Sequence, residues 1–155
     1  MSAIDTTRAS IVSALQTLCS GKAVDISATT DMSRVWALGQ RKPAIFVVYN
    51  GTTAARAQQQ IGQRLHTPVH QDWMIVILAQ NLRNAVEATN DATLGLDALV
   101  TLVRGIRNVG LAQPDTTAPL WLFLVSEKPV EESDNPPAGG TVAYICHYQT
   151  QPIWV

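Results

Sequence analysis

The sequence has little charge, little cysteine and no long apolar run. Aspartate, glutamate, lysine and arginine make up 15% of its 155 residues, against about 25% in typical soluble domains. The formal net charge of −1 provides no basic footprint for nucleic acid and no polybasic signal for a membrane surface. No stretch predicts a transmembrane helix, and the N-terminal residues do not match a signal peptide. A surface with so few charges favours lasting contact with other protein.

Only two cysteines are present, Cys19 and Cys146, so no disulfide framework is predicted. Without an export signal we expect both to be reduced thiols in a cytoplasm, where disulfides are rare. Unpaired cysteines mostly act as small buried apolar side chains, and we expect that role for both.

Catalytic and metal-binding patterns are also scarce. His66 and His70 are four residues apart, but Pro68 breaks a regular helix between them, so we interpret both as solvated loop histidines. Cys146 and His147 are neighbours, and on a strand they would point to opposite faces, which argues against a nucleophile and base pair. Neither a phosphate-binding loop nor a Gly-x-Ser-x-Gly motif occurs. We therefore expect no enzyme, no metal and no cofactor.

Short apolar runs are the main feature that the sequence does contain. Asp72–Asn81 is apolar at alternate positions on both sides and contains β-branched residues, which predicts a central strand covered on both faces. A buried helix remains the alternative, because short apolar runs do not separate the two. Ala44–Asn50 and Leu120–Ser126 have the same pattern, and Asn50-Gly51 predicts a turn. Thr141–Thr150 predicts a last strand.

Two other stretches have helical periodicity. Ile4–Leu18 carries one apolar stripe, and Ala92–Val109 repeats apolar residues at i, i+3, i+4 and i+7. Gly95 and Gly105 are unfavourable inside a helix and indicate close approach to another element. Pro114–Pro119 predicts a loop after the second helix.

The segment Thr52–Gln71 is ambiguous. The alanine and glutamine content of Ala54–Gln60 favours a helix, whereas polar alternation favours an edge strand. We interpret it as a strand near Gln58–His66 that forms a hairpin with Asp72–Gln80. Gly21–Lys42 has no sustained period and predicts a long, partly extended connection.

Together these elements predict an α+β fold in a single domain of residues 1–155. The expected architecture is one mixed or antiparallel sheet of four to five strands, with two main helices packed on one face. Helices pack about 8–10 Å apart and strands about 4.8 Å apart, so two helices cover one face of four strands. The other face is also apolar and is not normally left to water. Long connections would cover part of it, and we predict that another subunit covers the rest.

Candidate contact residues lie in the irregular segments. Trp36 either packs at the edge of the core or contacts another chain. Residues 127–140 contain three prolines and predict a mobile acidic loop. The apolar C-terminus with Trp154 is unusual for a free tail, so we expect it to dock on its own core or on a neighbour. The acids of the predicted loop are Glu127, Glu131, Glu132 and Asp134.

Five stretches carry a resemblance to a known family: Lys42–Gly51, Trp73–Arg83, Leu96–Ile106, Pro119–Leu122 and Tyr144–Thr150. In their order and apolar character they resemble the tail terminator (tail completion) proteins of long-tailed bacteriophages, in the branch of Mu-like phages and prophages. The likeness spans most of the chain.

The resemblance implies a small α/β subunit that assembles as a ring, usually a hexamer. Such a ring caps the tail tube at full length, ends polymerisation and offers a surface to the head-completion protein. It implies no catalytic residue and no cofactor. DNA would pass through without specific binding, and the acids of the loop would keep DNA from adhering if they line the channel. The expected location is the host cytoplasm during assembly and then the virion tail.

Two other interpretations stay open from the sequence. The protein could be a non-catalytic adaptor domain of a secretion or other assembly apparatus. It could also be a small hydrolase or transferase whose site the sequence does not reveal. Ring formation and binding to tube ends would distinguish the first interpretation from both.

Overall fold

The computed structural model describes residues 2–22, 24–30, 43–54, 59–61, 64–66, 68–80, 96–114, 116–129 and 141–154. Within these ranges the chain forms two α-helices, one short 3-10 helix and ten strands. In chain order they are α1 (Ala3–Leu18), β1 (Asp25–Thr29), β2 (Ala44–Ala54), β3 (Gln59–Ile61), β4 (Arg64–His66), β5 (Pro68–Gln80), α4 (Leu96–Arg104), η1 (Gly105–Asn108), β6 (Leu111–Gln113), β7 (Thr116–Leu120), β8 (Leu122–Pro129), β9 (Thr141–Thr150) and β10 (Ile153–Trp154).

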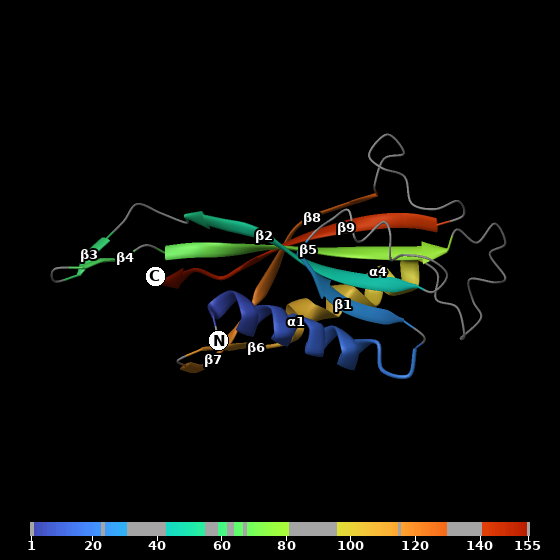
Figure 1. The fold of residues 1–155 in the computed structure, drawn as a ribbon, viewed down its shortest axis with the longest axis horizontal. Coiled ribbons are helices and arrows are strands. Elements are labelled where there is room, and N and C mark those ends of the chain that lie inside the picture. The colour runs from blue at the N-terminus through green and yellow to red at the C-terminus, as the bar shows by residue number, and fades with distance from the viewer. Residues whose placement is uncertain are drawn as a thin grey trace.

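Five strands form the body of one mixed sheet in the order β1–β2–β5–β9–β8, and β10 pairs with the start of β5 (Figure 1). β1 is parallel to β2, whereas the pairs β2–β5, β5–β9 and β9–β8 are antiparallel. Both helices lie on the same side of this sheet (Figure 1). The α+β fold predicted from the sequence, a mixed sheet with two helices on one face, is confirmed.

β5 lies at the centre of the sheet, as its apolar pattern predicts. Trp73, Ile75 and Ile77 point toward the helices and are fully buried. Val76 and Leu78 point the other way and are also buried. A strand covered on both faces needs apolar residues at every position, which explains why the run lacks a polar side.

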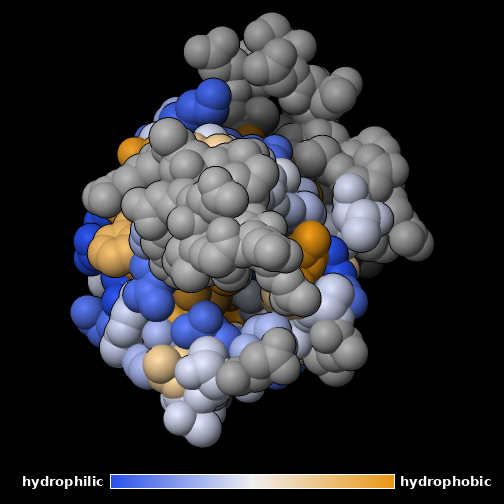
Figure 2. All heavy atoms as spheres, turned by 90° about the vertical axis from the view of Figure 1, so that its left-hand side faces the viewer, coloured by the Kyte–Doolittle hydropathy of each residue, from blue (hydrophilic) through white to orange (hydrophobic). Residues whose placement is uncertain are grey.

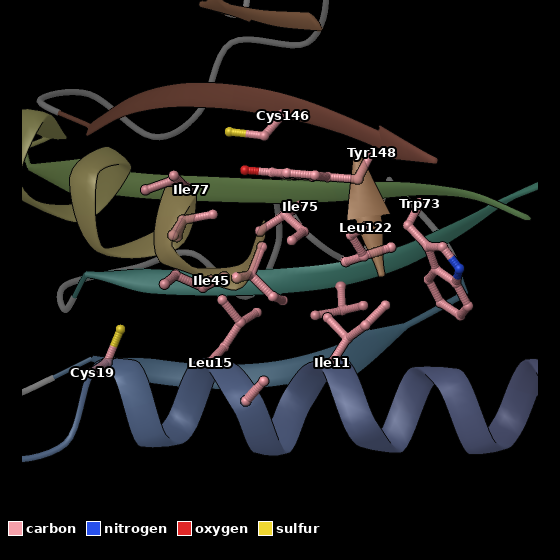
Figure 3. Close-up of a cluster of buried hydrophobic side chains, with 14 of the residues drawn as sticks. Ile11, Leu15, Cys19, Ile45, Trp73, Ile75, Ile77, Leu122, Cys146 and Tyr148 are labelled. Carbon is pink, nitrogen blue, oxygen red and sulfur yellow. The ribbon is translucent and has the colours of Figure 1, made fainter. Parts of the chain in front are cut away.

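The larger core, which we call the helix-side core, fills the space between the sheet and the helices (Figure 3). From α1, Ile11 and Leu15 point up at the sheet, where Ile45 and Ile75 meet them (Figure 3). α1 and η1 approach closely at Gly105, where an added Cβ would lie 3.0 Å from Leu18 Cδ2. The close approach predicted for this glycine is confirmed.

The opposite face of the sheet carries a smaller core, which we call the strand-side core. It contains six buried residues, all from β2, β5 and β9. They are Ala44, Phe46, Val48, Val76, Leu78 and Ala143, each at most 5% exposed in the single chain. These six residues are buried within one chain, whereas Met74 and Ile145 on the same face are only partly buried, so cover of the rest of this face by another subunit stays a prediction.

β2 and β5 continue past the helices as an arm, formed by residues 50–54 and 68–71 with β3 and β4 at its tip (Figure 1). The turn predicted at Asn50-Gly51 is wrong, because β2 runs through these residues to Ala54. The pairing register shifts between Tyr49 and Thr52 instead. Gly51 has φ +104°, a conformation that glycine adopts at no steric penalty.

The predicted hairpin between Gln58–His66 and Asp72–Gln80 is also wrong. β3 and β4 pair with each other, and β5 takes β2 and β9 as its neighbours. Alternating polar residues indicated extended structure correctly, but the sequence does not specify which strands become partners. β10 docks on β5 of the same chain, so the C-terminus follows the first of its two predicted alternatives.

Three further elements differ from expectation. β1 is a strand within Gly21–Lys42, and β6 and β7 form a hairpin that includes part of the loop predicted at Pro114–Pro119. The second helix is α4 followed by η1, ending at Asn108, while residues 92–95 lie outside the described ranges. Short polar strands lack the apolar alternation by which longer ones are recognised, which explains why these were missed.

Candidate functional site

Two of the six predicted contact residues lie within the described ranges. Glu127 is in β8 and Trp154 is in β10. The other four, Trp36, Glu131, Glu132 and Asp134, lie outside the described residues. In the described part of the chain, no three His, Cys, Asp or Glu side chains gather as a metal site. None of the described helices is long and apolar enough to cross a membrane.

Glu127 belongs to strand β8, which extends to Pro129. The acidic loop predicted for residues 127–140 is therefore wrong for residues 127–129. Arg104 of α4 donates from Nε to Oε1 at 2.9 Å and from Nη2 to Oε2 at 2.6 Å. The Glu127 side chain is only 10% exposed. Its charge is compensated by Arg104, and the ion pair fixes α4 against β8. Glu127 therefore does not present free negative charge on the surface.

The ion pair shifts the pKa values of its own two members, and burial shifts those of its neighbours. Hydrogen bonds from Arg104 lower the pKa of Glu127, and those bonds raise the pKa of Arg104 in turn. Burial raises the pKa of Tyr144, whose hydroxyl lies 3.5 Å from Glu127 Oε2. Burial also raises the pKa of Cys146 to about 12. Cys146 is a free, buried thiol that stays protonated at neutral pH.

The root of the arm contains a small polar network. The Nδ1 atom of His70 lies 2.7 Å from the carbonyl oxygen of Thr150 and donates to it. The Gln71 backbone amide donates to Thr150 Oγ1 at 3.0 Å, and Trp73 Nε1 donates to Gln71 Oε1 at 3.2 Å. His70 is thus a partner of β9 and not a solvated loop residue, so that prediction is wrong. The network joins the arm to the end of β9.

Seen from the arm end, the described surface is mostly hydrophilic, with isolated hydrophobic residues (Figure 2). The exposed residues of β2 in the arm are Asn50, Thr52, Thr53 and Ala54. Thr53 Oγ1 donates to Asp72 Oδ2 at 2.6 Å, so part of this polarity is satisfied by the neighbouring strand β5.

The clearest exposed apolar surface in the described chain lies on the edge strand β8. Phe123 is 56% exposed and Val125 is 57% exposed. The pairing of β8 with β9 shifts register between Leu124 and Ser126, which leaves Val125 as a bulge. An open hollow of about 540 Å³ lies here. Its lining residues are Arg107, Trp121, Leu122, Phe123 and Leu124.

The sequence did not single out this edge. Phe123 and Val125 have the same apolar character as their buried neighbours Leu122 and Leu120, so composition does not tell one face of β8 from the other. Phe123 points to the face opposite the buried Leu122, and Val125 lies at the bulge, so their exposure depends on how β8 pairs with β9. Edge strands and exposed apolar side chains are typical of protein contact surfaces.

The family model described as "Phage tail terminator protein" matches residues 3–114. The chain belongs to the phage tail terminator family. As a tail terminator family member it is a structural protein of phage tails and a component of the virion tail. The resemblance found in the sequence is confirmed.

A solved structure described as "Virion of native gene transfer agent (GTA) particle" is similar to this tail terminator family member. The TM-score is 0.52 at 11% sequence identity, and the alignment covers 97% of this chain and 97% of the other. At that identity the likeness shows the fold alone. No curated protein matches the sequence.

Proposed function

We propose that the protein forms a ring of six copies that caps the tail tube at full length. The ring ends polymerisation of the tube protein and presents a surface to the head-completion protein. Family membership over residues 3–114 is the observation that carries this proposal. The low share of charged residues, 15%, suits a chain whose surface stays in contact with other protein.

The shape of the sheet is compatible with a ring. Each copy in a ring meets the next head to tail, so a subunit needs two different contact surfaces. In the described chain β1 and β8 are the two edges of the sheet, and they differ in sequence and exposure. This supports a heterologous contact rather than a two-fold one.

In this proposal DNA passes through the ring without specific binding. Binding to phosphates requires lysine and arginine in excess, and the formal net charge here is −1. Glu131, Glu132 and Asp134 are the acids that would face the channel, since Arg104 compensates Glu127. Assembly takes place in the host cytoplasm, and the ring then remains in the virion tail.

Electron microscopy of purified protein mixed with growing tail tubes tests the proposal. We expect rings in the protein alone, rings at one end of each tube, and tubes of uniform length. Tubes grown with an unrelated protein of similar size serve as the control and should be longer and variable. A protein that stays monomeric at micromolar concentration and leaves tube length unchanged would overturn the proposal.

A further inference from the structure

The two edges of the sheet have opposite strand directions. In the described chain β1 pairs only with β2, and β8 pairs only with β9. One parallel step and three antiparallel steps separate β1 from β8, so the two edge strands run in opposite directions. When the axis of the ring is parallel to the strands, the rotation that relates one copy to the next leaves the direction of every strand unchanged. In such a ring β8 of one copy meets β1 of the next as an antiparallel pair, which is the more stable arrangement.

Opposite charges meet in this arrangement. Asp25 is exposed at the start of β1, and Lys128 is exposed near the end of β8. An antiparallel pair brings the start of one strand to the end of the other, so Asp25 approaches Lys128. A parallel pair would place Asp25 at the apolar start of β8 instead.

The two charges also lie on the same face. In the register of the sheet Asp25 pairs with Ala44, and Lys128 pairs with Ile145. Ala44 belongs to the strand-side core, and Ile145 packs against that core. A sheet that continues from one copy to the next keeps its faces, so Asp25 and Lys128 emerge on the same side of the joined sheet.

We infer that β1 of one copy pairs antiparallel with β8 of the next, with Asp25 opposite Lys128. This register sets Ser27 opposite Ser126, and it places the exposed Ala28 beside Val125. Small side chains on β1 allow the close approach that an added strand needs, while exposed Val125 gains cover. From Ser126 to Lys128 the pairing uses the part of β8 beyond the bulge, where its register with β9 is regular. The inference rests on the proposed ring and names the contact that builds it.

A disulfide across the contact gives the first test. In this register the Cα atoms of positions 27 and 126 lie about 4.5–5.5 Å apart, within the span of roughly 4.4–6.8 Å that a disulfide bridges. The double variant Ser27→Cys, Ser126→Cys should therefore form a ladder of covalent multimers on mild oxidation. A reducing agent should return the ladder to monomers. The native cysteines are both buried and do not compete.

The matched control is the double variant Ser13→Cys, Ser126→Cys. Ser13 is exposed on α1, away from the sheet edge. The control should give no ladder beyond dimers. An equal ladder in the control, or none in the test variant, would overturn the inference.

Charge reversal gives the second test. Asp25→Lys alone and Lys128→Asp alone each place like charges across the contact, and each should raise the concentration at which rings dissociate by about tenfold. When the two variants are mixed, alternating copies restore opposite charges at every contact, so rings should return. Asp97→Lys, an exposed position on α4, makes the same charge change as a control and should leave assembly unchanged.

The outcomes separate the inference from the proposed function. Suppose that the wild type forms rings, that neither charge reversal changes assembly, and that the cysteine pair forms no disulfide. That result would overturn the β1–β8 contact but not the proposed ring. Wild-type protein that forms no ring at all would overturn both. Ladder formation together with rescue by mixing supports both.

Discussion

The two faces of the sheet are buried by different means. The helix-side core draws on two helices, η1 and six strands, and contains nineteen buried residues of the described chain. The strand-side core contains six, all from three neighbouring strands. Both cores contain residues that one chain buries fully, but Met74 and Ile145 on the strand side are only partly buried. An apolar sheet face alone therefore does not show whether the same chain or a partner covers it. In this molecule exposed apolar residues appear at the edge strand instead.

The largest expected effect compares two neighbouring residues of β5. Ile77 and Leu78 are both at most 1% exposed, but they point into opposite cores. Ile77→Ala should cost about 4 kcal/mol and Leu78→Ala about 2.5 kcal/mol, within the usual range for such truncations. The larger core is bounded by more elements, so a cavity there can relax less. Urea unfolding of each variant gives the two values.

The same experiment can contradict the expected difference between the two cores. Equal losses, or a larger loss for Leu78→Ala, would mean that the strand-side core is as firmly packed as the helix-side core. Ala112→Ser, at an exposed position of β6, is a control that should change stability little.

An intermediate effect is expected at Gly110, next to the hairpin that closes the helix side. A Cβ added there would lie 2.7 Å from Pro119 Cβ, which is closer than real contacts allow. Gly110→Ala should therefore cost about 1–3 kcal/mol, the usual penalty for overpacking. Thermal unfolding measures it, with Ala118→Ser at an exposed position of β7 as control. A neutral result would show that the hairpin shifts freely and adds little to the helix-side core.

The smallest effect concerns the ion pair between α4 and β8, and it depends on pH. Arg104 lowers the pKa of Glu127 in the folded chain below its ordinary value of 4.5. The pair therefore contributes stability that is fully present above about pH 4.5 and is lost as the pH falls through the lowered pKa. Glu127→Gln should lose less stability at pH 7 than either β5 variant, because Arg104 is partly open to water.

The difference between wild type and Glu127→Gln should shrink as the solution is acidified. Thermal melts from pH 7 down to pH 3 measure it. Asp97→Asn, at an exposed position of α4, is the control. A difference that stays constant across this range would contradict an ionised, Arg104-bound Glu127.

The elements that the sequence predicted well are those with long periodic or apolar patterns. α1, β5, β9 and the α4 region all have a pattern repeated over several turns or residues, and a repeated pattern identifies an element without knowledge of its neighbours. The buried roles of Cys19 and Cys146 followed in the same way from composition.

The features that were missed depend on contacts between distant segments. β1 is polar and becomes a strand because β2 offers it an edge. Asn50-Gly51 has the composition of a turn, yet the long partner β5 keeps β2 extended through it. Glu127 was assigned to a loop from its acidic and proline-rich surroundings, whereas Arg104, distant in sequence, holds it in β8. The exposure of Phe123 and Val125 likewise depends on how β8 pairs with the distant strand β9.

The position of β9 has a consequence for synthesis of the chain. β9 is made after β5 and β8, yet it lies between them in the sheet. Until it emerges from the ribosome, β8 has no described strand to join, and the long sequence separation of β5 from β9 delays closure further. A nascent chain that still lacks β9 therefore has no finished β8 edge, and it can offer that edge to another copy only after β9 has been made.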